Sequence, residues 1–600
     1  MCGIVGYVGD ERVVPILRTG LENLEYRGYD SVGVALSGID DVRVHKQAGR
    51  IADLTLPEDD DATIGVGHTR WSTHGEPTDA NAHPHTDCTG RVAVVHNGII
   101  ENYDRLREEL SDHAFTSETD TEVVPHLIEE YLEECDDLPE AVERALDRLE
   151  GTFALGVVSA GFDGIVAARQ DNPLVVGRGE TGNFIASDVT AFLEHTRRVT
   201  YVEDGDVAVL TGDGVEIRND GVVVDRPTQE VEWEAEAAEK SGYDHYMLKE
   251  IHEQPTALRQ TLSGRIDELS GEVDLDVDLP NEYLNSLEEV TFVACGTSYH
   301  AGLYAARLVE SLADVRASAE IASEYEFDGG RDPWRTLVVP VTQSGETADT
   351  LSALRRAKRA GARSLAVTNT LGSTVSREAD DTIFIRAGPE IGVAATKTFG
   401  SQVATLALLS VSLARARGEM STTEAIDFLS NLRKLPGAVQ QVLDAEESLR
   451  EVAETYADSE AFFFIGRKLG YPVALEGALK LKEIAYVHAE GFAAGELKHG
   501  PLALVTPNSP VLAVLTGGAN AEATLNNVKE VESRGAPVLG CTSLPDAEKF
   551  LDVPFEIPDL GSLSPLVANV CFQLFAYHVA ALKGRSIDKP RNLAKSVTVE

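Results

Sequence analysis

The second residue of the chain is a cysteine, in the opening stretch MCGIVGY. A free cysteine is most often a small apolar core residue, and Cys2 could simply belong to a first strand. Removal of Met1 is expected before a small residue, and it would give Cys2 an α-amine with a pKa of about 8. That amine can serve as the general base for the thiol, as in N-terminal nucleophiles. Cys2 is therefore a candidate nucleophile if the chain supplies partners for it.

Partners of the right kind lie within residues 68–122, in the motifs HTRWSTHGEP, NAHPH, HNGIIEN and SETDTE. A guanidinium can grip a carboxylate with two hydrogen bonds, and a carboxylate can bind an ammonium group. Arg70 and Asp120 would therefore suit the two charged groups of an amino acid. Asn97 and Gly98 offer a side-chain amide and a flexible backbone N–H, which are the parts of an oxyanion hole.

The same region holds five histidines that raise the possibility of a metal site: His68, His74, His83, His85 and His96. Zinc-binding sequences usually contain an HExxH motif or closely spaced Cys and His pairs. Neither pattern is present. We therefore expect no metal among these histidines.

A second kind of site is indicated by TQSGET, residues 342–347, which ends a predicted strand and opens a helix. An ordinary N-cap would need only one Ser or Thr. CGTS, residues 295–298, repeats this chemistry one strand away and ends at Ser298. No Walker lysine and no GxGxxG motif is present, so no nucleotide is implied. The free N–H groups of a helix's first turn can converge on an anion, most simply a phosphate, together with Thr342, Gln343, Ser344 and Thr347.

The segment EGALKLKEIAYVHAEGFAAGELKHGPLA carries Glu476, Lys480 and Glu483 at spacings of four and three. One helix face therefore holds all three, although a solvated salt-bridge ladder would have the same spacing. The segment then reaches His499 at a Gly-Pro break, where functional groups are more usual than packing groups. Carboxylate, amine and imidazole near a phosphate site would suit proton transfers on a sugar phosphate.

The chain ends in DKPRNLAKSVTVE, which is short of charge for so acidic a protein. Chain ends are usually frayed and polar, so we expect this one to be docked. A buried Lys595 would have a lowered pKa and an amine able to attack a carbonyl.

The elements that must position these groups are of two kinds. In the first part of the chain, β-branched runs such as CGIVGYV, RVAVVHNG and TFALGVVSA alternate with acidic helical patterns. This mixture predicts a layered α+β domain with large sheets. In the second part, strand, Gly-rich turn and helix alternate in two copies with similar strand spacing. Their continuously apolar strands are typical of parallel, doubly wound sheets, which bind ligands at the carboxyl ends of the strands.

Composition excludes several classes of partner. Ninety-nine acidic against 52 basic residues leave a net charge of −47, so nucleic acid is not an expected partner. Such dense carboxylates suit a cytosol rich in salt. The six cysteines show no regular spacing, which indicates reduced thiols in a cytoplasmic protein, and no signal peptide opens the chain. The longest apolar stretch, from Pro565, contains Asn569, Gln573 and His578 and fits a buried helix better than a membrane span.

Taken in order, the motifs resemble those of the glutamine:fructose-6-phosphate aminotransferase (isomerising) family over essentially the whole chain. The set includes CGIVGY, EYRGYDSVG, HTRWSTHGEP, HNGIIEN, SETDTE, CGTSYHA, QSGETADT, EGALKLKEI, GELKHGPLAL and PRNLAKSVTVE. The resemblance implies a class II glutamine amidotransferase domain of N-terminal-nucleophile (Ntn) α+β fold, then two α/β flavodoxin-like sugar isomerase (SIS) domains. The implied boundaries are 2–225 for the glutaminase, 226–245 for a linker, 246–435 and 436–590 for the SIS domains, and 591–600 for a tail docked at the sugar-phosphate site.

The family's functional positions carry over residue by residue. In the first half, the resemblance implies that Cys2 forms a γ-glutamyl thioester, that Asn97 and Gly98 hold the oxyanion, and that glutamine is bound by Arg70, Trp71, Thr73, His83 and Asp120. In the second half, it implies a sugar-phosphate site made by Ser298, Thr342, Gln343, Ser344, Thr347 and Lys480. The implied catalytic groups there are Lys595 for the imine, Glu483 for proton transfer, and His499, supplied by the neighbouring subunit, for ring opening.

The implied reaction converts fructose 6-phosphate and glutamine to glucosamine 6-phosphate and glutamate, the first step of amino-sugar biosynthesis, with internal transfer of ammonia. It needs no cofactor, because imine and enol chemistry use only an amine, acids and bases. A homodimer or a higher homo-oligomer is implied. Two alternatives stay open: transfer to another sugar phosphate, and a non-catalytic SIS sensor of sugar phosphates. A sensor would need the phosphate loops but neither Cys2 nor Lys595 with Glu483.

Overall fold

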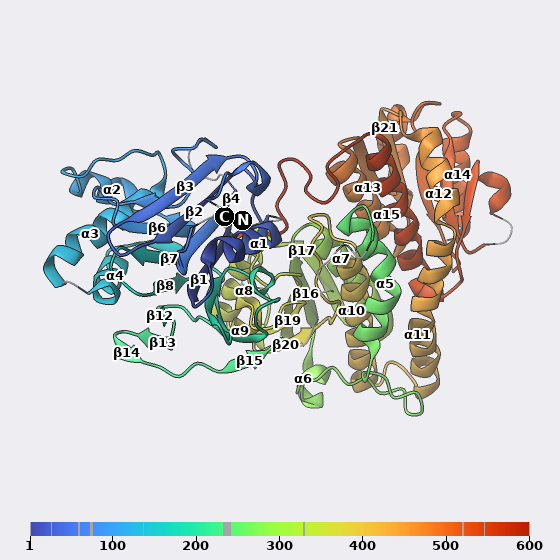
Figure 1. Ribbon diagram of the computed structural model, residues 1–600. Coiled ribbons are helices and arrows are strands. Elements are labelled where there is room, and N and C mark those ends of the chain that lie inside the picture. Colours follow the sequence, from blue (N-terminus) through green and yellow to red (C-terminus); the bar gives the residue numbers. More distant parts are fainter. Residues whose placement is uncertain are drawn as a thin grey trace. The chain divides into compact units, whose positions relative to one another are not determined.

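The computed structural model divides the chain into two compact units, residues 1–238 with 594–600, and residues 239–593 (Figure 1). We call them the first unit and the second unit. The structure describes residues 2–25, 27–57, 60–71, 76–135, 137–231, 240, 242–327, 330–518, 521–544 and 547–598. Part of the predicted linker, residues 232–239 and 241, lies outside the described residues, as do Met1, Thr73 and His74. The predicted domain boundaries stay predictions.

The first unit is built on two sheets whose described strand pairs are antiparallel. One sheet has the order β15-β11-β9-β10-β1-β4-β2-β3, with strands β15 (Thr228–Glu230), β11 (Arg198–Tyr201), β9 (Val175–Arg178), β10 (Gly182–Ala186), β1 (Gly3–Gly9), β4 (Ile64–Arg70), β2 (Ser31–Ser37) and β3 (Val42–Ala48). The other has the order β14-β13-β12-β8-β7-β6-β5, with strands β14 (Val222–Val223), β13 (Gly214–Asn219), β12 (Asp206–Thr211), β8 (Ile165–Gln170), β7 (Gly151–Ser159), β6 (Val92–Ile100) and β5 (His85–Thr86).

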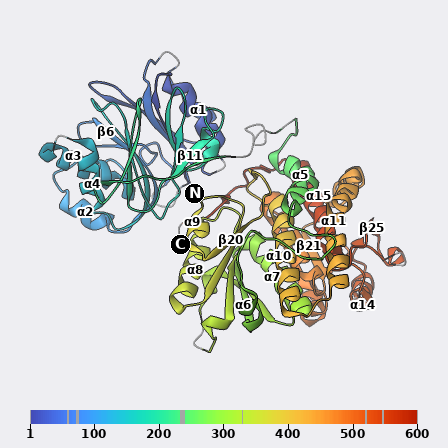
Figure 2. The ribbon, with the colours of Figure 1, turned by 90° about the horizontal axis from the view of Figure 1, so that it is seen from below.

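Side chains of β1 point alternately to its two faces, and this alternation explains how the two sheets stack. Ile4 and Val8 point into a core shared with Val95 and Ala154 of the second sheet. Val5 and Tyr7, on the other face of β1, pack against helix α1 (Val13–Leu24). The outer face of the second sheet is covered by α3 (Val123–Cys135) and α4 (Leu138–Leu146), so helices flank the paired sheets on both sides (Figure 2). The predicted layered α+β domain is confirmed.

The second unit contains two parallel sheets of five strands with the same topology. The first sheet has the order β17-β16-β18-β19-β20, with strands β17 (Arg316–Ile321), β16 (Glu289–Ala294), β18 (Thr336–Pro340), β19 (Arg363–Thr368) and β20 (Asp381–Phe384). The second has the order β22-β21-β23-β24-β25, with strands β22 (His488–Ala493), β21 (Ala461–Gly466), β23 (Val511–Leu515), β24 (Val538–Thr542) and β25 (Val553–Glu556). This 2-1-3-4-5 order is flavodoxin-like. The predicted repeat is confirmed, although the edge strands β17 and β22 were not among the strands that the repeat identified.

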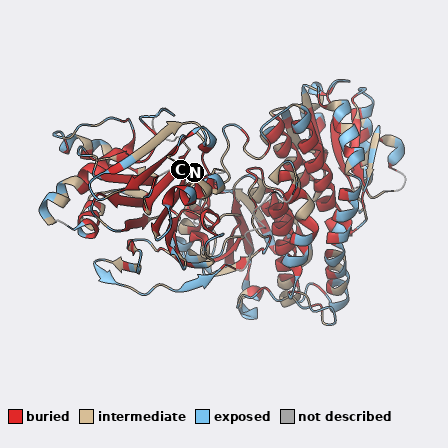
Figure 3. Ribbon diagram, viewed as in Figure 1, coloured by how far each residue is buried: buried red, intermediate tan, exposed pale blue. Residues whose placement is uncertain are grey.

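Helices cover these sheets and fuse the two repeats around one core, which appears as the buried interior of Figure 3. Two stretches in it are long and apolar enough to span a membrane, α10 (Lys397–Arg417) and Gly561–Leu582, which includes α15 (Ser564–Leu582). Their apolar windows are 83% and 89% buried inside the fold, so both are core helices, as expected for the stretch from Pro565. The remaining helices are α2 (Tyr103–Glu109), α5 (Tyr246–Leu262), α6 (Asn281–Ser286), α7 (Gly296–Ala313), α8 (Ala348–Ala360), α9 (Thr374–Glu378), α11 (Thr422–Asp444), α12 (Glu446–Tyr456), α13 (Gly470–Ala485) and α14 (Ala521–Glu532).

Candidate functional site

Cys2 stands immediately before β1, at the point where this strand pairs with the end of β4. The register matches Gly3 with Thr69, so the residues after Thr69 run past Cys2. The Cys2 Sγ accepts a hydrogen bond from the Trp71 backbone N–H at 3.2 Å and lies 3.5 Å from the Trp71 carbonyl oxygen. An N–H directed at sulfur stabilises a thiolate. The sheet register therefore presents the predicted nucleophile with a donor.

Asn97, on β6, lies directly against Cys2. Its Nδ2 donates to the Cys2 carbonyl oxygen at 3.0 Å. The His68 Nε2 lies 3.0 Å from the Asn97 Oδ1 and 2.9 Å from the His96 carbonyl oxygen. Because both of these atoms are acceptors, His68 Nε2 carries a proton, and this fixes the amide so that its NH₂ group faces Cys2.

Gly98 has a backbone conformation that only glycine adopts easily. Its φ is +132°, and an added Cβ would lie 2.0 Å from the Thr152 carbonyl oxygen on β7. The β6–β7 register holds this position, because Gly98 pairs with Phe153. A left-handed backbone here is specified by the sheet and not by a mobile loop, which suits a preorganised N–H donor.

The two charged residues predicted to bind an amino acid are both buried in the first unit. Arg70 ends β4 at 4% exposure, and Asp120 opens the short helix Asp120–Glu122 at 6% exposure. The Asp120 Oδ2 accepts the Ile100 N–H at 2.8 Å. Burial lowers the pKa of Arg70, and the nearby charges of Cys2 and Asp120 oppose that effect. The structure therefore brings Cys2, Arg70 and Asp120 into one electrostatic environment.

His68, His83 and His96 form a neutral hydrogen-bonded chain with Thr121. The His96 N–H donates to the His83 Nδ1 at 3.4 Å, so the proton of His83 is on Nε2, which lies 3.4 Å from the Thr121 Oγ1. That hydroxyl lies 2.8 Å from the His96 Nδ1. Burial lowers the pKa of His68 to about 3 and also lowers the pKa values of His83 and His96. His83 thus supports the site through Thr121, which neighbours Asp120.

In the second unit, the predicted phosphate loop joins β18 to α8. The Thr342 Oγ1 accepts the Gly345 N–H at 3.3 Å and lies 3.2 Å from the Thr347 Oγ1. The Ser344 Oγ accepts the Glu346 N–H at 3.2 Å, and Thr347 is the N-cap residue of α8. These bonds curl the backbone so that hydroxyls gather at the start of the helix, where anions bind best.

Ser298 lies on the neighbouring strand-to-helix turn, in the first turn of α7 after β16. Its Oγ accepts from the Gln402 Nε2 of α10 at 2.9 Å. Because β16 and β18 are adjacent parallel strands, their carboxyl ends share one edge of the sheet. In the order β17-β16-β18 this edge is the topological switch point, the usual ligand position in such sheets. The structure thus brings Ser298 to the same edge as the loop of residues 342–347.

Lys480 sits at the centre of an ion cluster in which Lys480 and Glu476 are fully buried and Glu483 is partly exposed. Its Nζ lies 2.6 Å from the Glu483 Oε2 and 3.3 Å from the Glu476 Oε1, and it donates to the Thr297 Oγ1 at 3.1 Å. Burial disfavours the charge of Lys480, but the two carboxylates outweigh it and raise the pKa of the amine. Two of the three residues on the face predicted from the helical spacing, Glu476 and Lys480, are therefore fully buried, and the solvated salt-bridge ladder is excluded.

The same cluster links the two repeats. The Glu476 Oε1 accepts from the Thr297 Oγ1 at 3.0 Å, and the Glu476 Oε2 lies 2.7 Å from the His300 Nδ1 of α7. Thr297 follows Gly296, the first residue of α7, and stands next to Ser298. The catalytic candidates on α13 are thereby tied to the phosphate side of the first sheet.

His499 and Lys595 come from other segments of the chain than α7 and α13. His499 ends the short helix Glu496–His499 and is exposed. Lys595 is partly exposed and belongs to residues 594–600, which group with the first unit. The chain just before it is attached to the second unit, because the Arg591 N–H donates to the Tyr486 hydroxyl at 2.8 Å. The roles of both residues at the sugar site stay predictions.

Comparison with known proteins agrees with this arrangement. The glutamine amidotransferase domain family matches residues 68–194, and the SIS domain family matches residues 283–412 and 455–582. A glutamine–fructose-6-phosphate aminotransferase (isomerizing) of Halobacterium salinarum is 62% identical over 601 residues, covering 100% of both chains. The chain belongs to the glutamine–fructose-6-phosphate aminotransferase (isomerizing) family. The resemblance of its motifs to this family is confirmed.

Other relatives agree with this assignment. The aminotransferase of the same name from Methanosarcina mazei is 48% identical over 619 residues, again with both chains fully covered. Among solved structures, the C-terminal domain of glucosamine-fructose-6-phosphate aminotransferase from Francisella tularensis matches with a TM-score of 0.56 and 38% identity. It covers 59% of this chain and 99% of its own length. The pair of SIS domains is thus shared with a solved structure of this family, and the chain as a whole aligns with aminotransferases over their full length.

Some residues that support the sites were not predicted from the sequence. Thr297 and His300 stand in the motif CGTSYHA, but their link to Glu476 depends on the packing of α7 against α13. Lys46 donates to the carbonyl oxygens of Ala80, Ala82 and Pro84 at 3.1, 2.8 and 3.2 Å, which anchors the segment around His83. The only signal in the sequence was that Lys46 is the single lysine before Lys240.

Substitution Gly98→Ala tests the backbone at the predicted oxyanion position. The new Cβ would meet the Thr152 carbonyl at 2.0 Å and displace the N–H. Loss of one such donor costs about 100-fold in turnover, so glutamate release from glutamine should fall by that factor while fructose 6-phosphate binding is retained. Gly90→Ala is the control, since Gly90 also has a positive φ but has open space at its Cβ. Unchanged glutamate release in Gly98→Ala would contradict the assignment.

The neutral histidines predict a pH dependence of stability in the first unit. Their pKa values are lower when folded than the value of about 6.5 expected when unfolded. Their contribution is therefore complete above pH about 6.5 and is lost as the pH falls toward the folded values, by about 1.4 kcal/mol per pH unit for each histidine. Hydrogen exchange of peptides from β4 and β6, corrected for intrinsic rates, should show protection falling between pH 7 and about 5.5. Constant protection over this range would show that these histidines are not held neutral.

Removing the buried amine should destabilise the second unit. Lys480→Met leaves Glu476 and Glu483 without their cation, and breaking a buried pair in this way costs about 3–5 kcal/mol. We expect a clear drop in the calorimetric unfolding temperature of the full chain. Lys482→Met is the matched control, because Lys482 is exposed on the same helix and should change the temperature little. Equal effects of the two substitutions would mean that the ion cluster contributes nothing specific.

Proposed function

We propose that this chain converts fructose 6-phosphate and glutamine to glucosamine 6-phosphate and glutamate, the entry reaction of amino-sugar biosynthesis. The observation that carries the proposal is the 62% identity over the full length with an aminotransferase of that name. The site geometry supports it independently, because a nucleophile with a donor stands in one unit and a phosphate loop with buried acid–base groups in the other.

The first half-reaction would take place at Cys2. With Met1 removed, the α-amine accepts the thiol proton, and the sulfur attacks the side-chain amide carbon of glutamine. The Asn97 Nδ2 and the Gly98 N–H would hold the developing oxyanion, while Arg70 and Asp120 bind the carboxylate and the ammonium group of the substrate. Ammonia leaves, and water then releases glutamate from the thioester. Trp71 would gate the passage of ammonia, a role supported by the contact of its backbone N–H with the Cys2 sulfur.

The second half-reaction would use the sugar phosphate held at the switch point of the first SIS sheet. Ser298, Gln343, Ser344 and their neighbours bind the phosphate group. The Lys595 amine would condense with the C2 carbonyl of the open-chain ketose to form an imine, and the C2 oxygen leaves as water. Ammonia then displaces the Lys595 amine from C2, which leaves the nitrogen on the sugar and frees the lysine. Glu483 then moves a proton between C1 and C2, which converts the ketose to the aldose.

Lys480 contributes to this step by its fixed positive charge. Its amine lies 2.6 Å from Glu483 and is held in the ammonium form by two carboxylates. That charge favours the ionised form of Glu483, the form a base requires. His499 is exposed and would complete the site of a second copy of the chain as the ring-opening group, so the active assembly is a homodimer or a higher oligomer.

The remaining features fit a soluble, cytoplasmic enzyme. All six cysteines are free thiols, and the apolar helices are buried in the core. The reaction uses side-chain acids, bases and amines, so the proposed mechanism requires no cofactor.

The decisive experiment incubates the protein with glutamine and fructose 6-phosphate and measures glucosamine 6-phosphate. Low and multimolar salt are both needed, because the net charge of −47 makes self-repulsion strong when it is unscreened. Formation of the product supports the proposal, and mass spectrometry of the same sample reports whether Met1 has been removed. If no product forms in either salt from chains that lack Met1, the aminotransferase proposal is wrong and a sugar-phosphate sensor is favoured.

Cys2→Ala should separate the two half-reactions. The variant lacks the nucleophile and should lose glutamine-dependent synthesis by at least about 10³-fold, yet it should still make product from added ammonium. Cys135→Ala is the matched control. Cys135 ends α3, and its described hydrogen bonds are to the backbone carbonyl oxygens of Tyr131 and Asp137. Glutamine use that survives in Cys2→Ala would overturn the nucleophile assignment.

A further inference from the structure

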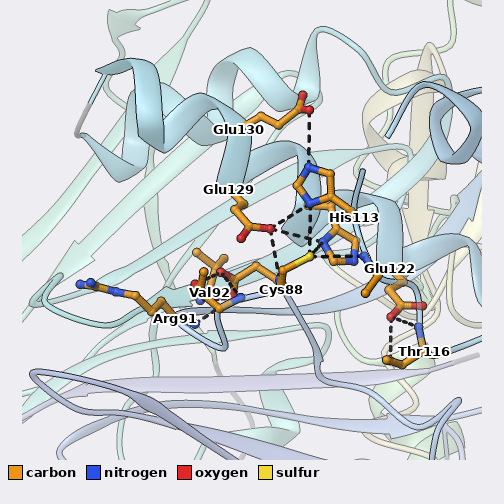
Figure 4. A network of polar contacts seen from close by, with 12 residues as sticks. Cys88, Arg91, Val92, His113, Thr116, Glu122, Glu129 and Glu130 are labelled. Carbon is orange, nitrogen blue, oxygen red and sulfur yellow. Dashed lines mark hydrogen bonds and ion pairs between the residues drawn. The ribbon is translucent and has the colours of Figure 1, made fainter. Parts of the chain in front are cut away.

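Four metal-ligating side chains meet in the first unit, outside the residues assigned to glutamine. They are Cys88, His113, His126 and Glu129, and one ligand atom of each can be chosen so that all lie within 4.8 Å of one another. They come from three separate segments: the turn between β5 and β6, the turn after α2, and helix α3. Figure 4 shows Cys88, His113 and Glu129 directed toward one another.

The distances match a metal coordination shell. The Cys88 Sγ lies 3.4 Å from the His113 Nδ1 and 3.6 Å from the His126 Nδ1. The Glu129 Oε2 lies 3.0 Å from the His113 Nδ1 and 3.5 Å from the His126 Nδ1. Zinc bonds of about 2.0–2.3 Å place the ligand atoms of a tetrahedron about 3.3–3.8 Å apart. Four of the distances between the ligand atoms are therefore close to those of a zinc tetrahedron.

A second layer of contacts orients these ligands. The His113 Nε2, on the far side of the ring, lies 3.5 Å from the Glu130 Oε1, the carboxylate–histidine arrangement that supports zinc ligands. The Ala114 N–H donates to the Cys88 Sγ at 3.4 Å, as backbone amides do to metal-bound sulfur. The Cys88 N–H donates to the Glu129 Oε2 at 3.1 Å. Each of these contacts leaves the inward-facing ligand atom able to bind a metal.

Packing holds the two segments that carry the cysteine and the buried histidine. The Asp87 Oδ1 accepts the N–H groups of Arg91 and Val92 at 2.8 Å each, which fixes the turn that presents Cys88. The His126 ring is 1% exposed and packs edge-on against Phe115, with ring centroids 4.7 Å apart. Cys88 is exposed, so an ion can reach the cluster from solvent.

We propose that Cys88, His113, His126 and Glu129 bind one zinc ion in a closed, structural site. Two imidazoles and a thiolate select zinc over the oxygen-seeking ions calcium and magnesium. The thiolate and the carboxylate together balance the charge of Zn²⁺, which removes the cost of holding two anions side by side. Four protein ligands leave no position for substrate, as in structural zinc sites.

This site differs from the expectation of no metal, which rested on the five histidines of residues 68–96 and on the lack of a short Cys/His motif. Its ligands are 25, 13 and 3 residues apart in sequence, so only the fold brings them together. The ion would tie the start of α3 to the β5–β6 turn. Asp120 lies immediately before α3, and the metal would therefore stabilise the segment that carries it.

The first test is direct metal analysis of the full chain. Protein loaded with zinc and then passed over a chelating resin should retain about one zinc ion per chain. Replacement by Co²⁺ should give the intense absorption of a tetrahedral cobalt ion and a thiolate-to-cobalt charge-transfer band. This measurement needs no variant, so it does not depend on whether a substitution folds. Failure of the wild-type chain to hold zinc, or a weak octahedral cobalt spectrum, would overturn the proposal.

Variants then assign the ligands. Cys88→Ser and His126→Gln should each weaken zinc binding by at least about 10-fold, since even the loss of an outer contact costs that much. Cys88→Ser should also lose the charge-transfer band. Cys135→Ser changes the thiol at the end of α3, the helix that carries His126 and Glu129, and should bind zinc like the wild type. A double variant of Cys88 and His126 that still holds one zinc ion would show that the metal is elsewhere. The result is independent of the proposed synthase activity, because zinc content and cobalt absorption are read without substrate.

Discussion

The second unit is organised around one ammonium group that has no contact with water. Lys480 keeps its charge in the interior only because Glu476 and Glu483 flank it and Thr297 accepts its remaining proton. These groups come from α13 and α7, one helix from each repeat, so the charge requires the two repeats to pack in a single way. Buried ion pairs often add little net stability, but they penalise every arrangement that separates them. The position of the phosphate loop relative to the acid–base residues follows from this constraint.

The first unit solves a different problem, which is to hold a reactive residue at the very start of the chain. Chain ends normally fray, but β1 is paired with β4 from Gly3 and with β10 from Val5. The same sheets impose the backbone of Gly98 and bury four histidines in the neutral form. The site is thus rigid because it belongs to sheets, and its histidines position other groups without carrying charge.

The proposed zinc site would also stabilise elements at the edge of a sheet. The β5 strand is only two residues long, and α3 begins directly after the three-residue helix Asp120–Glu122. Glu122 already secures one side by accepting from the backbone and hydroxyl groups of Thr116 and Ser117. A metal bound to Cys88 and α3 would secure the other side. In so acidic a chain, a divalent cation also reduces repulsion between neighbouring carboxylates.

The sequence by itself determined the fold class, the repeat and most of the chemistry, because alternating strands, Gly-rich turns and ordered motifs are local patterns. It also determined that Glu476, Lys480 and Glu483 share a helix face. Only the tertiary structure decided that Glu476 and Lys480 on this face are buried, that Thr297 and His300 reach it, and that Asn97 faces Cys2. It alone brought Cys88 to His113, His126 and Glu129. The physical reason is the same in each case: burial and long-range contacts depend on how elements pack, and residue spacing along the chain carries information only within one element.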